Sequence, residues 1–353
     1  MSITLFQPVV WSANLLNTLD KSLVYAGAPC SNRDYEGEIS AFGSSVKITH
    51  IGDPTIAPYT KDTNLGDPEA LTDDQQTLLI DQQNSFNFQV DDIDKAQVRN
   101  SGGLMNEATK RAGFGLRDAA DKSAAAKMAA AAGKGLGVID ASATASNVYD
   151  SVLVPASVAL DEANVPEELR WIVLPPAVYG KLQLDARFIK QNESGTDALH
   201  NGKVGDAAGF RIYKSNNAPL AASHAIADVV TTSGNKILTS ASGGFRQSDI
   251  GSAITGTGIG ASSVILTVNA AGTSATVDVN STASGTVTGT VAAGANKLVI
   301  AGSQIAHSFA QQILEIQAYK PEKRFGDALK GLHVFGSKVT RREALVVAGV
   351  KTA

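Results

Sequence analysis

Three carboxylates lie within four positions of the stretch FNFQVDDIDKAQ, residues 86–97: Asp91, Asp92 and Asp94. Carboxylates so close together could bind a divalent cation or share acid and base roles in catalysis. No His, Cys or Glu lies close by to complete such a site, and the EF-hand pattern is absent. The alternating aromatic residues before them predict a strand, and a helix is expected to begin near Ile93. We therefore predict that the aspartates cap this helix, because carboxylates accept hydrogen bonds from its first N–H groups.

Other residue types that could do chemistry do not form a recognisable site. The GK pair in AAGKGLG, around Lys134, lacks the spaced glycine and the following Ser or Thr of a phosphate-binding P-loop. GTGIGA at 256–261 resembles a dinucleotide-binding loop, but no helix is expected after it. The five histidines never occur at the spacing of metal ligands: His50, His200, His224, His307 and His333. We predict no catalytic, cofactor-binding or metal-binding residues, and no enzyme activity.

The composition is that of an ordinary globular protein. The chain has 353 residues, of which 43% are hydrophobic and 18% charged, enough for two or three domains. A net charge of -4 argues against a protein that binds nucleic acid through a basic surface, but not against one that encloses nucleic acid. The single cysteine, Cys30, cannot form an intrachain disulfide. The amino-terminal stretch does not resemble a signal peptide, and no segment approaches the roughly 18 apolar residues of a membrane helix. A cytoplasmic setting, or a particle assembled there, is expected.

Hydrophobic periodicity predicts the elements of the first half. An apolar stripe and a serine cap predict a helix over residues 12–25. SVKITHI and SFNFQV alternate with period two, so we expect them to form the arms of one long two-stranded excursion with an irregular, proline-containing tip. A long helix is expected from Ile93 to Ala132, where an alanine run precedes Gly133.

The second half reads as α/β with an interruption. WIVLPP predicts a buried strand, PAVYGKLQLD a helix that begins at proline, and GFRIYKS another strand. Between Gly251 and Asn296 the only charged residue is Asp278, and there is no aromatic residue. Short β-type runs separated by small polar residues predict an independent all-β insertion there. The α/β pattern then returns, with a strand around Leu332 and Val334.

The order of these segments resembles the major capsid proteins of tailed bacteriophages, which have the Hong Kong 97-type fold. The resemblance covers nearly all of residues 1–220 and 300–353. It is carried by four phrases: FQPVVWSANLL (Phe6–Leu16), NRDYEGEISAFGSSVKI (Asn32–Ile48), FNFQVDDIDKAQ (Phe86–Gln97) and FGDALKGLHVFGSKVTRREAL (Phe325–Leu345). The fold class expected from it is α+β, with the all-β module inserted into the capsid fold.

The resemblance implies a division of the chain into named parts. We expect an amino-terminal arm, an extended loop (E-loop), the spine helix of a peripheral domain (P-domain), an axial domain (A-domain), the inserted β module, the return of the A-domain and the closing strands of the P-domain. The expected boundaries are, in that order, 1–33, 34–90, 91–137, 138–228, 229–296, 297–310 and 311–353.

The resemblance also implies partners and a location. The protein would assemble with copies of itself, as hexamers and pentamers, into an icosahedral virion shell built in the host cytoplasm. A scaffolding protein and a portal would assist, and the shell would enclose double-stranded DNA without sequence-specific binding and without a membrane. Two alternatives remain open: an encapsulin-like nanocompartment shell, or a surface glycan-binding phage structural protein. The inserted module is expected on the outer face and is expected to be dispensable for assembly.

Overall fold

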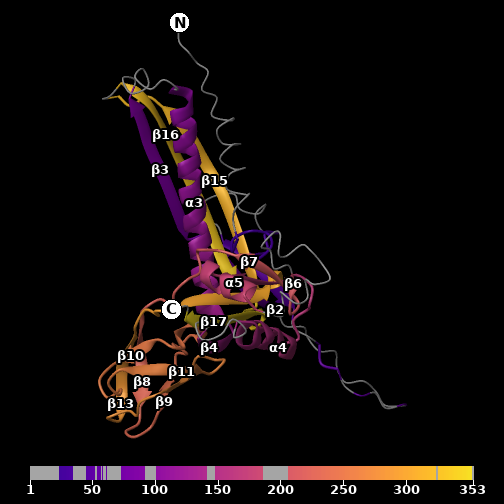
Figure 1. The fold of residues 1–353 in the computed structure, drawn as a ribbon, viewed down its shortest axis with the longest axis vertical. Helices are drawn as coiled ribbons and strands as arrows, with labels where there is room; N and C mark the ends of the chain where they lie inside the picture. Colours follow the sequence, from indigo (N-terminus) through magenta and orange to yellow (C-terminus); the bar gives the residue numbers. More distant parts are fainter. Residues whose placement is uncertain are drawn as a thin grey trace.

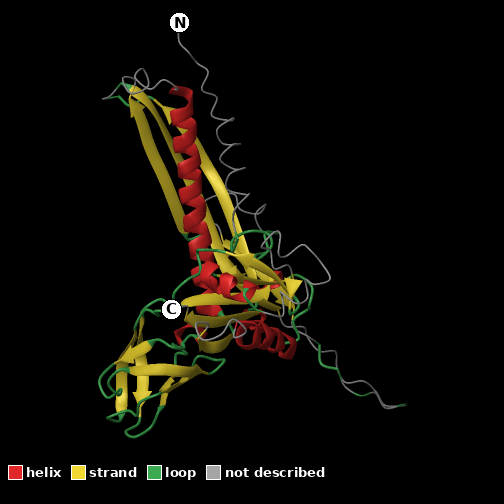
Figure 2. Cartoon of the chain, in the orientation of Figure 1, coloured by secondary structure: helices red, strands yellow, loops and turns green. Residues whose placement is uncertain are grey.

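A computed structural model describes residues 24–34, 45–51, 54–56, 58, 61, 73–91, 101–140, 148–185, 206–322 and 325–351. Within them, a long arm of sheet and helix extends from a body built on a second sheet, and a small β-barrel lies on the far side of that body (Figures 1 and 2). No described helix combines the length and the apolar character that a membrane span requires.

The body is built on a mixed six-stranded sheet in the order β4-β17-β14-β5-β7-β6. Strands β5 and β17 are buried along almost their whole length, as expected for apolar runs that lie inside a sheet covered on both faces. The predicted strands in WIVLPP and GFRIYKS are confirmed as β5 and β7. The six strands are β4 (Lys134–Asp140), β5 (Arg170–Leu174), β6 (Asp206–Ala207), β7 (Phe210–Lys214), β14 (Lys297–Ser303) and β17 (Leu345–Lys351).

Two short helices add to the core of the body. Helix α5 (Pro176–Gln183) begins at a proline, whose fixed φ suits a first helical turn, and it confirms the predicted helix. A π-helical segment, Tyr149–Leu153, runs directly into α4 (Val154–Glu162). Both helices bury apolar side chains in the same core as Trp171 and Phe210.

The arm consists of a three-stranded antiparallel sheet in the order β15-β16-β3, with helix α3 lying along it (Figure 1). Helix α3 packs against β16 and β3, and confirms the predicted long helix over its described range. Side chains of β3 alternate between half-buried and exposed, as its period-two sequence predicts. The bounds are β3 (Gln82–Asp91), α3 (Ser101–Ala131), β15 (His307–Tyr319) and β16 (Gly326–Val339).

A separate two-stranded sheet pairs β1 (Ser45–Ile51) with β2 (Asp73–Leu79). The predicted pairing of SVKITHI with SFNFQV is therefore wrong, because β3 pairs with β16 along all of its residues. The true partner, β2, has the sequence DDQQTLL, in which Leu78 is buried while Leu79 is 55% exposed. A strand that buries so few apolar side chains carries almost no period-two signal.

The barrel closes in the order β10-β11-β12-β9-β8-β13 and has a hydrophobic core of its own. The incoming and outgoing chain segments lie side by side, since Leu220 bridges Lys297 and the N–H of Gly294 donates to the carbonyl of Ala221 at 2.9 Å. Its strands are β8 (His224–Thr231), β9 (Ile237–Ser240), β10 (Ala253–Thr255), β11 (Ser263–Val268), β12 (Ser274–Val277) and β13 (Gly285–Val291).

The sheets divide the chain differently from the expected boundaries. Strand β4 runs across the boundary expected at 137, and β8 runs across the one expected at 229. The segment 311–353 is shared, because β16 lies in the arm whereas β17 lies between β4 and β14 in the body. The helix expected over 12–25 falls outside the described residues except at its last two positions.

Candidate assembly site

Of the three clustered aspartates, the structure describes only Asp91. Asp91 is the last residue of β3 and lies opposite Gly326 of β16. Asp92 and Asp94 lie outside the described residues, so the predicted helix cap stays a prediction. Among the described residues there is no group of three His, Cys, Asp or Glu side chains that could hold a metal ion.

The described histidines are dispersed and two of them are deeply buried. Burial, followed by the charge of Lys127, lowers the pKa of His307 to about 3, and burial lowers the pKa of His333 to about 4. His224 instead faces the buried carboxylate of Asp249 in the barrel, with 3.4 Å between Nε2 and Oδ2. His200 and the side chain of His50 lie outside the description. Both buried rings are neutral at neutral pH, so neither could act there as an acid.

The two glycine motifs make close backbone contacts. In GTGIGA, a Cβ atom on Gly260 would lie 2.6 Å from the carbonyl oxygen of Asn280, and Gly258 has a φ of +79°. The motif is therefore a tight turn inside the barrel. Lys134 of the GK pair is the first residue of β4, 57% exposed, with its Nζ atom 3.9 Å from Glu162. Neither stretch leads into a helix that could bind a phosphate.

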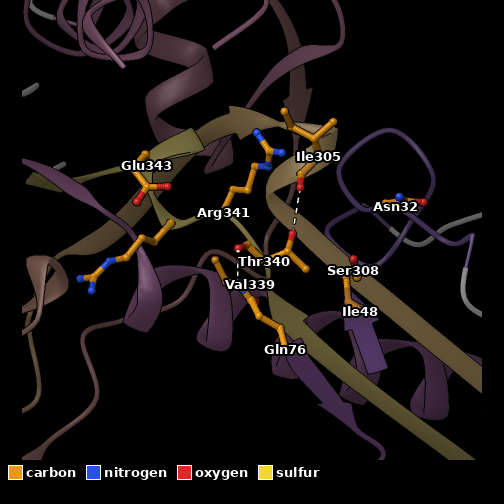
Figure 3. Close-up of a pocket in the computed structure, with 10 residues that line it drawn as sticks. Asn32, Ile48, Gln76, Ile305, Ser308, Val339, Thr340, Arg341 and Glu343 are labelled. Atoms are coloured by element: carbon orange, nitrogen blue, oxygen red, sulfur yellow. Dashed lines mark hydrogen bonds between the residues drawn. The ribbon is translucent and has the colours of Figure 1, made fainter. Parts of the chain in front are cut away.

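A groove of about 630 Å³ lies where the arm, the body and the β1–β2 sheet meet (Figure 3). Thr340 lies near its centre: its hydroxyl donates to the carbonyl of Ile305 at 2.9 Å, and its carbonyl accepts from the side chain of Gln76 at 3.3 Å. Arg341 and Glu343 lie on one side, with Asn32, Ser308 and Ile48 on the other (Figure 3). The residues that line it are Asn32, Ile48, Gln76, Ile305, Ser308, Val339, Thr340, Arg341, Arg342 and Glu343.

The groove suits contact with another polypeptide better than catalysis. Its lining includes amide and hydroxyl groups, exposed charges of both signs and a patch at Ile305, which is 39% exposed. Among the described residues that line it there is no His, Lys or Cys, so within them its hydroxyl groups have no neighbouring base of those types. Exposed charges beside an apolar patch are typical of the rim and core of a protein interface.

Sequence reasoning missed the contact that attaches the barrel to the body. The 3₁₀ turn Gln247–Asp249 and the following Ile250 pack on β4 at Gly135. A Cβ atom on Gly135 would lie 2.7 Å from Cδ1 of Ile250 and 2.9 Å from Oε1 of Gln247. The carbonyl oxygen of Gln247 would lie 3.0 Å from the same Cβ atom, so glycine lets the turn approach the strand backbone without a shift. The signal that could have predicted this contact was the glycine-rich stretch AAGKGLG.

Comparisons with known proteins agree with this architecture. Residues 77–252 match the family model described as phage capsid protein. No curated protein sequence matches the chain. A structure from Mycobacterium phage Che8 has a TM-score of 0.59 at 23% identity, covering 93% of this chain and 91% of that one.

Two further solved structures share the fold at lower identity. The capsid structure of cyanophage P-SCSP1u has a TM-score of 0.55 at 17% identity, covering 89% of this chain and 85% of that one. The mature capsid of bacteriophage PhiM1 has a TM-score of 0.54 at 13% identity, covering 88% and 82%. With the family match across the arm, the body and the start of the barrel, and with the fold shared along the chain, this protein is a phage major capsid protein, a structural subunit of the virion shell.

Proposed function

We propose that this capsid subunit is of the Hong Kong 97 type and assembles as hexamers and pentamers into an icosahedral shell around double-stranded DNA. The observation that carries the proposal is the arm, in which a 31-residue helix lies along a long three-stranded sheet. Alternate side chains of β3 are exposed on the open face of that sheet. The two-stranded β1–β2 sheet shares only a small core with the base of the arm. Such extended elements gain further burial when they lie on neighbouring copies.

In this proposal each structural unit has a role in the shell. Helix α3 with β3, β15 and β16 forms the P-domain, and the six-stranded sheet with α4 and α5 forms the A-domain. The segment around β1 and β2 is the E-loop, and residues 1–33 form the amino-terminal arm. The groove at Thr340 receives part of another copy, because it lies where three of these units meet.

The proposed partners follow from the same assignment. The net charge of -4 is consistent with a shell that encloses DNA without binding it sequence-specifically. A scaffolding protein and a portal are proposed to direct assembly in the host cytoplasm. We also propose that the barrel is an inserted module on the outer face, since its second half carries a single charged residue, Asp278, and so has little means of interacting with DNA.

Electron microscopy of the protein co-expressed with its scaffolding protein tests the proposal. We expect closed shells tens of nanometres across. A variant that lacks residues 1–23 is the control, and we expect it to yield soluble subunits with fewer closed shells. Sedimentation of the full chain as a monomer in the presence of scaffold would contradict the proposal.

A further inference from the structure

One buried side chain of α3 holds the start of the described chain. Asp121 is 3% exposed, and its Oδ1 atom accepts hydrogen bonds from three successive backbone N–H groups. The donors are Val24 at 3.0 Å, Tyr25 at 2.8 Å and Ala26 at 3.3 Å. Successive N–H groups that point at one acceptor form an anion-binding nest. The carboxyl group of Asp121 therefore fills a site made by the backbone of a distant segment.

The second oxygen of the same carboxyl group reaches a third part of the fold. Oδ2 of Asp121 accepts from the side-chain amide of Asn217 at 2.9 Å. Asn217 lies on the connection between β7 and the barrel. A single side chain thus joins the amino-terminal segment, the helix of the arm and the connection to the barrel.

Residues 24–32, which we call the amino-terminal anchor, are attached independently at their other end. Asn32 donates its N–H to the carbonyl of His307 at 2.8 Å, and its carbonyl accepts the N–H of Phe309 at 2.9 Å. The Ser31 hydroxyl donates to the carbonyl of Tyr25 at 2.5 Å and lies 2.8 Å from Nδ1 of His307. Because the hydroxyl proton is used on Tyr25, the second bond is donated by the histidine ring. Loss of Asp121 would therefore leave residues 24–26 held only by the Ser31–Tyr25 bond and by the packing of Tyr25 and Ala26, while Asn32 stays attached.

We propose that Asp121 is a positioning residue for assembly, whose carboxyl group holds residues 24–26 in place and so orients the amino-terminal arm proposed above. The proposal rests on the assignment proposed above of residues 1–33 as the amino-terminal arm of a shell subunit. Its physical basis is that three N–H groups of the anchor share one acceptor, so removing it takes from all three the partner that the described residues supply.

Cys30 provides a direct reporter of the anchor. It is the single cysteine of the chain, lies inside the anchor and is 0% exposed. Burial, and then the nearby Asp121, raise the pKa of its thiol well above the ordinary value. Since the thiolate is the reactive form, the native subunit should react very slowly with an aromatic disulfide reagent. Opening of the anchor should expose the thiol and speed the release of the coloured aromatic thiolate.

The experiment compares four variants of the unassembled subunit. Asp121→Ala removes the acceptor, and we expect thiol labelling at least tenfold faster under conditions in which the subunit stays folded. Asp121→Asn keeps one oxygen for the nest but removes the charge near the thiol and the acceptor for Asn217, so its rate should lie between those of wild type and Asp121→Ala. Asp118→Ala, which breaks only an exposed pair with Lys122 on the same helix, should label as wild type does. Leu116→Ala lowers stability in α3 without touching the nest.

The outcomes separate positioning from general stability. Labelling of Asp121→Ala at the wild-type rate would overturn the proposal, and so would equally fast labelling of Leu116→Ala at matched stability. In assembly with scaffold, folded Asp121→Ala subunits should give fewer closed shells than Asp118→Ala, and equal yields would overturn the assembly role. If the shell proposal itself fails, wild type and Asp118→Ala form no shells either, whereas the labelling result still decides whether Asp121 holds the anchor.

Discussion

At the scale of single residues, the buried histidines make the stability of the subunit depend on pH. His333 is 0% exposed on β16, its ring centroid lies 5.2 Å from that of Phe335, and neither ring nitrogen has a hydrogen-bond partner among the described residues. His307 is also 0% exposed and uses only Nδ1. Charging either ring would place an ion in an apolar environment, so the folded state binds these protons only in acid.

We predict that the unassembled subunit loses stability as the pH falls below about 6.5, the ordinary histidine pKa. The unfolded chain takes up each proton near that pH, whereas the folded pKa is about 4 for His333 and about 3 for His307. Stability from these groups is therefore complete above pH ~6.5 and falls as the pH drops toward the folded pKa. At pH ~5 the loss should be about 2 kcal/mol for each histidine. Urea unfolding at neutral pH and in mild acid measures this loss as a difference in the free energy of unfolding.

The variant His333→Leu provides the control, because leucine suits the apolar site and does not titrate. The difference in unfolding free energy between the two pH values should shrink by roughly half, the share of one of two similar groups. An unchanged difference would show that His333 does not carry this dependence, whatever the absolute stability of the variant.

At the scale of elements, local sequence predicted those strands and helices whose own residues carry the signal. WIVLPP and PAVYGKLQLD each combine an apolar pattern with proline at a boundary, and both were predicted correctly. Strand β2 was missed because Leu78 is buried but Leu79 is exposed, so its apolar residues do not alternate as those of a half-buried strand do. Asp121 could not be singled out from the sequence, since its partners, Val24 to Ala26, lie 97 to 95 positions earlier. Pairings over such separations leave no trace in a local pattern.

The contact between the barrel and β4 provides a test at the same scale. Gly251 has a φ of +86°, and a Cβ atom there would overlap Cγ2 of Val138 on β4. Gly251→Ala should therefore suffer both backbone strain of about 1–2 kcal/mol and overpacking of about 1–3 kcal/mol. Thermal or urea unfolding of the unassembled subunit measures the sum.

Gly234→Ala is the matched control, since Gly234 lies in the same barrel with a φ of +77° and nothing within 4 Å of its Cβ position. It should show the backbone strain alone. Adding Val138→Ala to Gly251→Ala should recover the excess, because it removes the overlapping methyl group. Equal costs for the two glycine variants would mean that Val138 moves aside freely and that the contact is loose.

At the scale of the whole molecule, the composition of the sequence predicted an inserted β module but not the residues at which the barrel begins and ends. The loss of charged and aromatic residues after Gly251 marks its second half, while β8 has an ordinary composition and starts at His224, before the predicted boundary at 229. The position of β17 in the body could not be predicted for a similar reason: its sequence does not say which sheet it joins. Its apolar sequence fits any buried strand, and only the pairing with β14 and β4 decides which sheet it joins.

The barrel can be removed at a point that the structure defines. Ala221 and Gly294 are joined by a backbone hydrogen bond of 2.9 Å, so a short Gly/Ser linker can replace residues 222–293 without moving either end. Closing a short loop in place of a long one costs little entropy, and the core of the barrel is separate from that of the body. We predict that the shortened subunit folds and still forms closed shells of the same diameter. Electron microscopy should show density missing from the outer surface.

Gly251→Ala is the comparison in the assembly experiment, because it keeps the barrel while disturbing its contact with β4. Both variants should assemble if the barrel is a surface module that contributes no contact between copies. Shells from Gly251→Ala but none from a folded, soluble shortened subunit would mean that the barrel itself joins neighbouring copies. Density lost from the inner wall would place the barrel on the DNA side, where the low charge of its second half would have to be explained by exclusion of DNA, not by binding to it.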